Sequence, residues 1–169
     1  MIFCQSPNKQ TGRAGYKPEA VVIHVCEGTF DGTKAWFLNP ASKVSAHFLI
    51  SDESLIYQFV KCEDTAWHAG VIVRPIWKKL KEGVNPNRYT IGIELAGFCK
   101  DKPTLSKMVT AARLVRALCN RFNIEVNNQN IIPHYWIHGG KTCPGPNINL
   151  DALIYMASLP LDTSDMNII

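Results

Sequence analysis

The sequence predicts an α/β fold in a single domain, with a central mixed β-sheet flanked by helices. The chain has 169 residues, which is the length of one domain. Short β-branched runs alternate with amphipathic stretches along the whole chain, as in α/β folds. Its composition, 46% hydrophobic and 19% charged, is ordinary for a globular protein and excludes a disordered chain. We therefore expect one domain over residues 1–169, with its core at about 16–158.

The first half of the chain contains three expected strands and one helix. Residues 1–19 are rich in turn residues and predict an irregular lead-in. The run 20–25 is apolar without polar alternation, which is typical of a strand buried on both faces. A short helix over 33–38 should end before Pro40. The runs 45–50 and 55–60 flank a polar tetrapeptide, which indicates a hairpin.

The second half contains two further strands and two helices. Residues 89–95 predict another buried strand. Apolar residues recur every three or four positions over 105–122, and Thr104 precedes them as a capping residue, so this segment is the clearest helix. A brief strand at 130–133 and a last helix near 150–159 complete the pattern.

The net charge of +4 comes from a single segment. Residues 74–88 hold five cations and only one acidic residue, and they belong to a long, mostly polar loop over 71–88. Two interpretations remain open: a solvated loop, or a basic rim that attracts an anionic ligand. A nucleic-acid-binding protein usually has a broader basic face with interleaved aromatic residues. We therefore expect no nucleic-acid partner.

The N-terminal residues and the cysteines are used to predict the cellular compartment of the protein. No stretch reaches the roughly 18 apolar residues of a membrane span, and residues 1–8 lack the basic and apolar regions of a secretory signal. We expect a protein that is cytoplasmic as synthesised, without membrane association, and monomeric. The six cysteines show no paired spacing, so most are interpreted as reduced, buried thiols. Cys143 is set apart, because it also lies near other potential metal ligands.

Three residues have side chains that suit a metal ion. His24 lies inside a β-branched strand, His134 follows a strand, and Cys143 comes nine residues later in a turn rich in glycine and proline. Catalytic zinc sites use three such ligands and keep one position open. A lone histidine in a strand is more often a hydrogen-bonded core residue, so the spacing of these residues leaves a zinc site and a core role both open. His134 and His138 have the His-x-x-x-His spacing that can hold a metal ion on one face of a helix. Gly139 and Gly140 follow directly and argue against a helix there.

Two charged residues are candidates for acid–base and electrostatic roles. Glu94 is a carboxylate near the end of an apolar strand, where burial would raise its pKa toward the range useful for proton transfer. Lys141 precedes Cys143 by two residues, so its ammonium can reach the same pocket and stabilise an oxyanion. The structural alternatives are an ion pair for Glu94 and a solvated turn for Lys141.

Five motifs in order carry a family resemblance. They are Val21-Val22-Ile23-His24, the run 44–50 (VSAHFLI), the run 66–70 (AWHAG), the run 91–95 (IGIEL) and the run 141–146 (KTCPGP). Together, over about residues 5–158, they resemble the zinc-dependent N-acetylmuramoyl-L-alanine amidases of the type-2 amidase family. That family includes phage lysozyme-type amidases, anhydro-muropeptide amidases and peptidoglycan recognition proteins.

The resemblance implies a fold, an activity and a ligand set. It implies the fold of the type-2 amidases and peptidoglycan recognition proteins. It implies zinc-dependent hydrolysis of the amide between N-acetylmuramic acid and L-alanine in peptidoglycan or muropeptides. His24, His134 and Cys143 would hold Zn²⁺, Glu94 would act as general base and Lys141 would stabilise the oxyanion. Certain phage members carry a catalytic tyrosine where this chain has Ala46, so the glutamate is expected to take that role.

The resemblance also suggests residues for substrate binding, and it leaves alternatives open. Trp67, His68, His47 and Arg88, with the basic segment 74–88, are expected to line the groove for the glycan and the anionic stem peptide. The main alternative is a catalytically silent peptidoglycan-binding module on the same fold. A zinc peptidase or nuclease of another fold lacks support, because the chain contains no His-Glu-x-x-His motif. Both a phage endolysin, which reaches the wall after release, and a cytosolic recycling enzyme fit the sequence.

Overall fold

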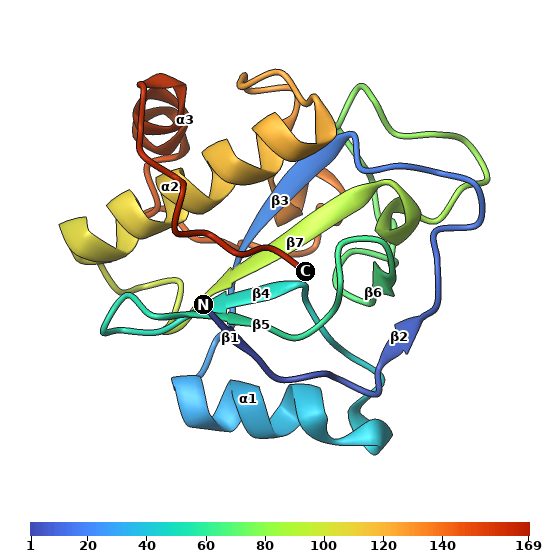
Figure 1. Ribbon diagram of the computed structural model, residues 1–169. Helices are drawn as coiled ribbons and strands as arrows, with labels where there is room; N and C mark the ends of the chain where they lie inside the picture. Colours follow the sequence, from blue (N-terminus) through green and yellow to red (C-terminus); the bar gives the residue numbers. More distant parts are fainter.

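The computed structural model describes all 169 residues and has a mixed six-stranded sheet at its centre (Figure 1). The strands follow the order β1 (Ile2–Phe3), β5 (Ile56–Gln58), β4 (Phe48–Ile50), β7 (Thr90–Leu95), β3 (Ala20–Val25) and β8 (Ile131–Pro133). Strands β4, β7, β3 and β8 run parallel to one another, whereas β5 is antiparallel to β4. A separate antiparallel pair joins β2 (Lys9–Gln10) to β6 (Thr65–Ala66). The predicted α/β fold with a mixed sheet is confirmed.

Three α-helices cover the sheet. Helices α2 (Leu105–Phe122) and α3 (Leu150–Ser158) lie together, and α1 (Phe30–Leu38) lies away from them (Figure 1). The side chains of β4 show why: Phe48 and Ile50 join the cluster that contains α2, while Leu49 points the other way and packs with Phe37 of α1. The sheet therefore has helices on both faces, which explains why β3 is buried along its whole length, as expected.

The clearest differences from the sequence expectation lie at the start of α1 and in the hairpin of β4 and β5. Helix α1 begins at Phe30 rather than 33, because the Thr29 hydroxyl accepts a hydrogen bond from the Gly32 amide and caps the helix earlier. The hairpin of β4 and β5 is confirmed, but residues 45–47 are outside the strand. Ser45 is held elsewhere, since its amide donates to Trp67 and its hydroxyl to the carbonyl of Asn8. Thr104 caps α2 as predicted, by accepting from Lys107.

The long loop over 71–88 is anchored at its middle and its end. The Trp77 ring is 4% exposed, stacks on Tyr89 at a centroid distance of 5.8 Å and donates its indole N–H to the Gln129 carbonyl. The loop ends in a short 3₁₀ helix, η2 (Pro86–Arg88), directly before β7. This loop therefore packs beside the sheet and places residues 85–87 at the amino end of β7, where the Pro86 carbonyl accepts from the Thr90 hydroxyl. None of the helices is both long and apolar enough to cross a membrane.

Candidate metal centre

The parallel strands bring three titratable side chains to one edge of the sheet. His24 is the fifth residue of β3 and pairs in register with Glu94 of β7. On the other side, β8 pairs Pro133 with Ile23, so His134 follows directly beside His24. Ligand sites in α/β proteins form at the carboxyl ends of parallel strands. The fold therefore places His24, His134 and Glu94 where such a site is expected.

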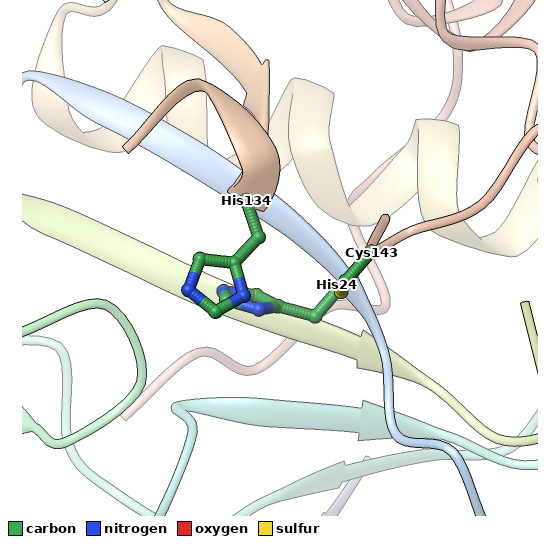
Figure 2. Close-up of side chains that lie close together, drawn as sticks. All are labelled: His24, His134 and Cys143. Atoms are coloured by element: carbon green, nitrogen blue, oxygen red, sulfur yellow. The ribbon is translucent and has the colours of Figure 1, made fainter. Parts of the chain in front are cut away.

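Cys143 completes a cluster of three metal-binding side chains (Figure 2). One donor atom each from His24, His134 and Cys143 lie within 4.8 Å of one another, and the two imidazole centroids are 4.5 Å apart. The backbone amide of Val25 donates a hydrogen bond of 3.3 Å to the Cys143 sulfur. Gly145 permits this turn: it has φ +90°, and a Cβ there would lie 2.4 Å from the Cys99 carbonyl oxygen.

The donor set suits Zn²⁺. Burial lowers the pKa of His24 well below its usual 6.5 and lowers that of His134 to about 4, so both imidazoles are neutral at pH 7, as a metal ligand must be. Burial raises the pKa of Cys143 in the metal-free protein, and the Val25 amide provides a donor for the thiolate that a metal would induce. Two imidazoles, one thiolate and an open fourth side match a catalytic zinc site.

Glu94 carries a largely buried carboxyl group beside this cluster. Its Oε1 lies 3.8 Å from Nδ1 of His24, and its Oε2 has no hydrogen-bond partner. Burial raises the pKa of Glu94 to about 8. An unpartnered buried carboxyl group is unfavourable for folding, so its presence indicates a functional use.

The cluster lies in a cleft of about 770 Å³. This volume is within the usual range for small-molecule sites. The cleft is lined by Glu94, Lys141, Lys43, Trp67 and His138, in addition to the three ligand candidates. His138 is not part of the donor cluster. Its ring centroid is 6.1 Å from that of His134, and its Nδ1 accepts from the Gly140 amide.

Comparison with known proteins identifies the family. The sequence model of the N-acetylmuramoyl-L-alanine amidases matches residues 14–146, which include the whole cluster and Glu94. The chain belongs to the N-acetylmuramoyl-L-alanine amidase family. The resemblance inferred from five motifs is thereby confirmed at the level of the family.

Individual members of the amidase family show how far the similarity extends. The chain is 39% identical over 127 residues to N-acetylmuramoyl-L-alanine amidase A of Achromobacter lyticus, covering 73% of this chain and 64% of that protein. It is 31% identical over 150 residues to the amidase CwlH of Bacillus subtilis, covering 82% of this chain and 52% of that protein. The chain thus spans between about half and two thirds of these two relatives. A crystal structure of AmpD superimposes with a TM-score of 0.77 at 26% identity, covering 93% of this chain and 94% of that one.

Two of the substrate-binding residues expected for this amidase-family chain lie elsewhere. His47 is fully buried, with its Nε2 2.8 Å from the Arg13 guanidinium and its Nδ1 accepting from the Gly92 amide, so it does not line the cleft. Arg88 and the other cations of 74–88 are also absent from the cleft wall. Lys81 instead pairs with Glu19 at 2.8 Å, and Lys79 donates to Asn130. Trp67 and His68 do line the cleft.

Several cleft residues of this amidase-family domain were not anticipated from the sequence. Lys43 and Glu27 line the cleft, and both have positive φ, at +56° and +53°. Asn87 of η2 also lines the cleft, as does Asn85, the residue directly before η2. The Asn87 Oδ1 accepts from the backbone amides of His68 and Ala69, which fixes that segment. An asparagine beside a proline in a polar loop gives no sequence signal that distinguishes it from a turn residue.

Proposed function

We propose that this domain hydrolyses the amide bond between N-acetylmuramic acid and L-alanine in peptidoglycan or muropeptides, with Zn²⁺ as its cofactor. The observation that carries the proposal is the convergence of His24, His134 and Cys143 with Glu94 in one cleft of an amidase-family fold. This combination supplies metal ligands and an acid–base group together, as hydrolysis of an unactivated amide requires.

His24, His134 and Cys143 would hold the zinc ion. When bound, zinc supplies Lewis acidity that polarises the scissile carbonyl group and acidifies a water molecule. The ligand residues are held by the ends of β3 and β8 and by the Val25 amide, so little reorganisation is needed on binding.

Glu94 would transfer the proton. Its buried Oε2 has no other partner and is available to take a proton from the attacking water. The same oxygen then gives that proton to the nitrogen of L-alanine, which leaves as a free amine, while the hydroxyl stays on the lactyl carbonyl carbon as a carboxylic acid. A cation at the neighbouring ligand site favours the ionised form of the carboxyl group, so that Glu94 can act as the base at neutral pH.

Lys141 and the cleft wall would bind the substrate. The Lys141 side chain lies at the cleft near His134, where its ammonium can stabilise negative charge on the carbonyl oxygen. Lys43 adds a second cation for the anionic stem peptide, and the indole of Trp67 offers an apolar face to the sugar. We extend the proposal to residues 1–169 as one catalytic domain, with its core at about 16–158, acting as a monomer.

Mass spectrometry of muropeptides incubated with the zinc-loaded protein tests this function. We expect release of a stem peptide that begins at L-alanine, and loss of that product after chelation of the metal. Parallel reactions with anhydro-muropeptides and with intact sacculi distinguish a recycling activity from wall lysis. Intact muropeptides in every reaction, with the substrate still bound, would contradict hydrolysis and support the silent binding module.

A further inference from the structure

A chain of hydrogen bonds runs behind His24, on the side away from Glu94. The Thr90 hydroxyl lies 2.8 Å from the Pro86 carbonyl oxygen and 3.3 Å from Nε2 of His68. The opposite nitrogen of that ring, Nδ1, lies 3.1 Å from Nε2 of His24. The chain therefore links the backbone of η2 to one ring nitrogen of a metal-ligand candidate.

The direction of each bond follows from the carbonyl at its end. A carbonyl oxygen only accepts, so Thr90 uses its single hydroxyl proton on Pro86 and has only lone pairs to offer His68. Nε2 of His68 must then be the donor. In a neutral imidazole the other nitrogen is unprotonated, so Nδ1 of His68 accepts from Nε2–H of His24.

The position of His68 is set by its surroundings. Its ring lies directly over Gly92 of β7, where a Cβ would come within 2.5 Å of the ring. Its plane is at 88° to that of His24, and its backbone amide is held by Asn87. Thr90 and Gly92 lie opposite Ala20 and Val22 in the sheet register, four and two residues before the pair of His24 with Glu94. The same face of β7 therefore carries the Thr90 hydroxyl, the space that Gly92 leaves for the His68 ring, and the Glu94 carboxyl group.

We propose that Thr90 and His68 are positioning residues that fix His24 as the tautomer protonated on Nε2, leaving the Nδ1 lone pair for the metal. The inference deepens the proposed function and rests on it only for the role of the metal. Nδ1 is the nitrogen that faces Glu94, at 3.8 Å from Oε1. Outer hydrogen bonds of this kind orient a metal-binding histidine and increase its basicity. His68 accordingly acts through His24, in addition to any contact that it makes with substrate.

Two substitutions at Thr90 test the proposal through zinc affinity, measured by competition with a chromophoric chelator. Thr90→Val keeps the shape but removes the hydroxyl, so zinc binding should weaken by about 10- to 100-fold. Thr90→Ser keeps the hydroxyl and should retain wild-type affinity. Equal zinc affinity of the valine and wild-type proteins would overturn the proposal, provided that circular dichroism shows both folded.

Nitrogen-15 NMR of the histidine rings in the metal-free wild-type protein gives a second test, which holds even if Thr90→Val does not fold. We expect the proton on Nε2 in both His24 and His68; a proton on Nδ1 of His24 would overturn the inference. These readouts are separate from catalysis. If the expected tautomer and zinc affinity accompany a failure to cleave muropeptides, the proposed function fails and this inference stands. If cleavage occurs with His24 protonated on Nδ1, only this inference fails.

Discussion

Glu94 combines burial, a missing hydrogen-bond partner and a place beside the three metal-ligand candidates. Burial alone raises its pKa to about 8, so the metal-free protein carries this side chain as a neutral acid at pH 7. A cation held at His24 has the opposite effect on the carboxyl group. In the proposed mechanism, metal binding and proton transfer are therefore coupled at Glu94.

Replacement of Glu94 by glutamine tests the proton-transfer role. Glu94→Gln keeps the size of the side chain but cannot take a proton, so turnover of muropeptides should fall by about 10²- to 10⁴-fold. Zinc content, measured by atomic absorption, should remain at the wild-type level. Glu53→Gln, in the exposed turn of the hairpin, serves as the control with unchanged turnover. Full activity of Glu94→Gln would assign the base elsewhere.

The residue scale also shows what a sequence can and cannot predict about a site. His24, Glu94 and His134 stand at the ends of recognisable strands, so their convergence follows from parallel pairing. His47 lies in a comparable apolar run, yet it faces Arg13 inside the protein. Thr90 resembles any β-branched strand residue, and its contact with His68 joins positions 22 residues apart in sequence. The facing direction and the long-range partner decide these roles, and neither is encoded locally.

At the scale of elements, the sheet is held in place by α2. The helix begins at the predicted cap and buries a stripe that includes Met108, Leu114 and Leu118 against β3 and β7. Its periodicity made this the most predictable element. The sequence defines the shorter strands β4, β5 and β8 less well, because each has only three residues.

Truncation within α2 tests the importance of this packing. Leu114 is fully buried, so Leu114→Ala should lower the free energy of unfolding by about 2–5 kcal/mol. Leu105, in the same helix, is 75% exposed, and Leu105→Ala should change it by less than about 0.5 kcal/mol. Urea denaturation monitored by circular dichroism measures both. Similar losses in the two variants would show that α2 stabilises the protein in another way.

At the scale of the whole molecule, the fold class and the sheet edge that holds the site were predictable, whereas the walls of the cleft were not. Alternating strands and helices predict a sheet of mainly parallel strands. In such a sheet, ligand sites form at the carboxyl ends of the strands. The charge of the segment 74–88 suggested a wall that the structure does not contain. Those cations pair with Glu19 and Asn130 or lie outside the cleft, and Lys43 and Lys141 provide its positive charge.

Stability should also depend on pH through His47, a buried histidine outside the proposed metal centre. Burial and the Arg13 guanidinium hold the pKa of His47 well below 6.5 in the folded protein. Below about pH 6.5 the unfolded chain binds a proton at this histidine and the folded chain does not. The free energy of unfolding therefore decreases as the pH is lowered, by about 1.4 kcal/mol per pH unit for this group. His47→Asn keeps an acceptor for Gly92 and removes the titrating ring. Urea titrations from pH 5 to 7 should show a slope smaller by that amount, and an unchanged slope would contradict the assignment.

The central claim is that His24 forms one zinc site with His134 and Cys143 from the distant end of the chain. X-ray absorption at the zinc edge tests it most directly. For the zinc-loaded protein we predict one sulfur ligand at about 2.3 Å, with two imidazole nitrogens at about 2.0–2.1 Å. The Cys143→Ala protein should lose that sulfur signal, together with most of its bound zinc. A wild-type spectrum without sulfur, or with several sulfurs, would contradict the site formed by His24, His134 and Cys143.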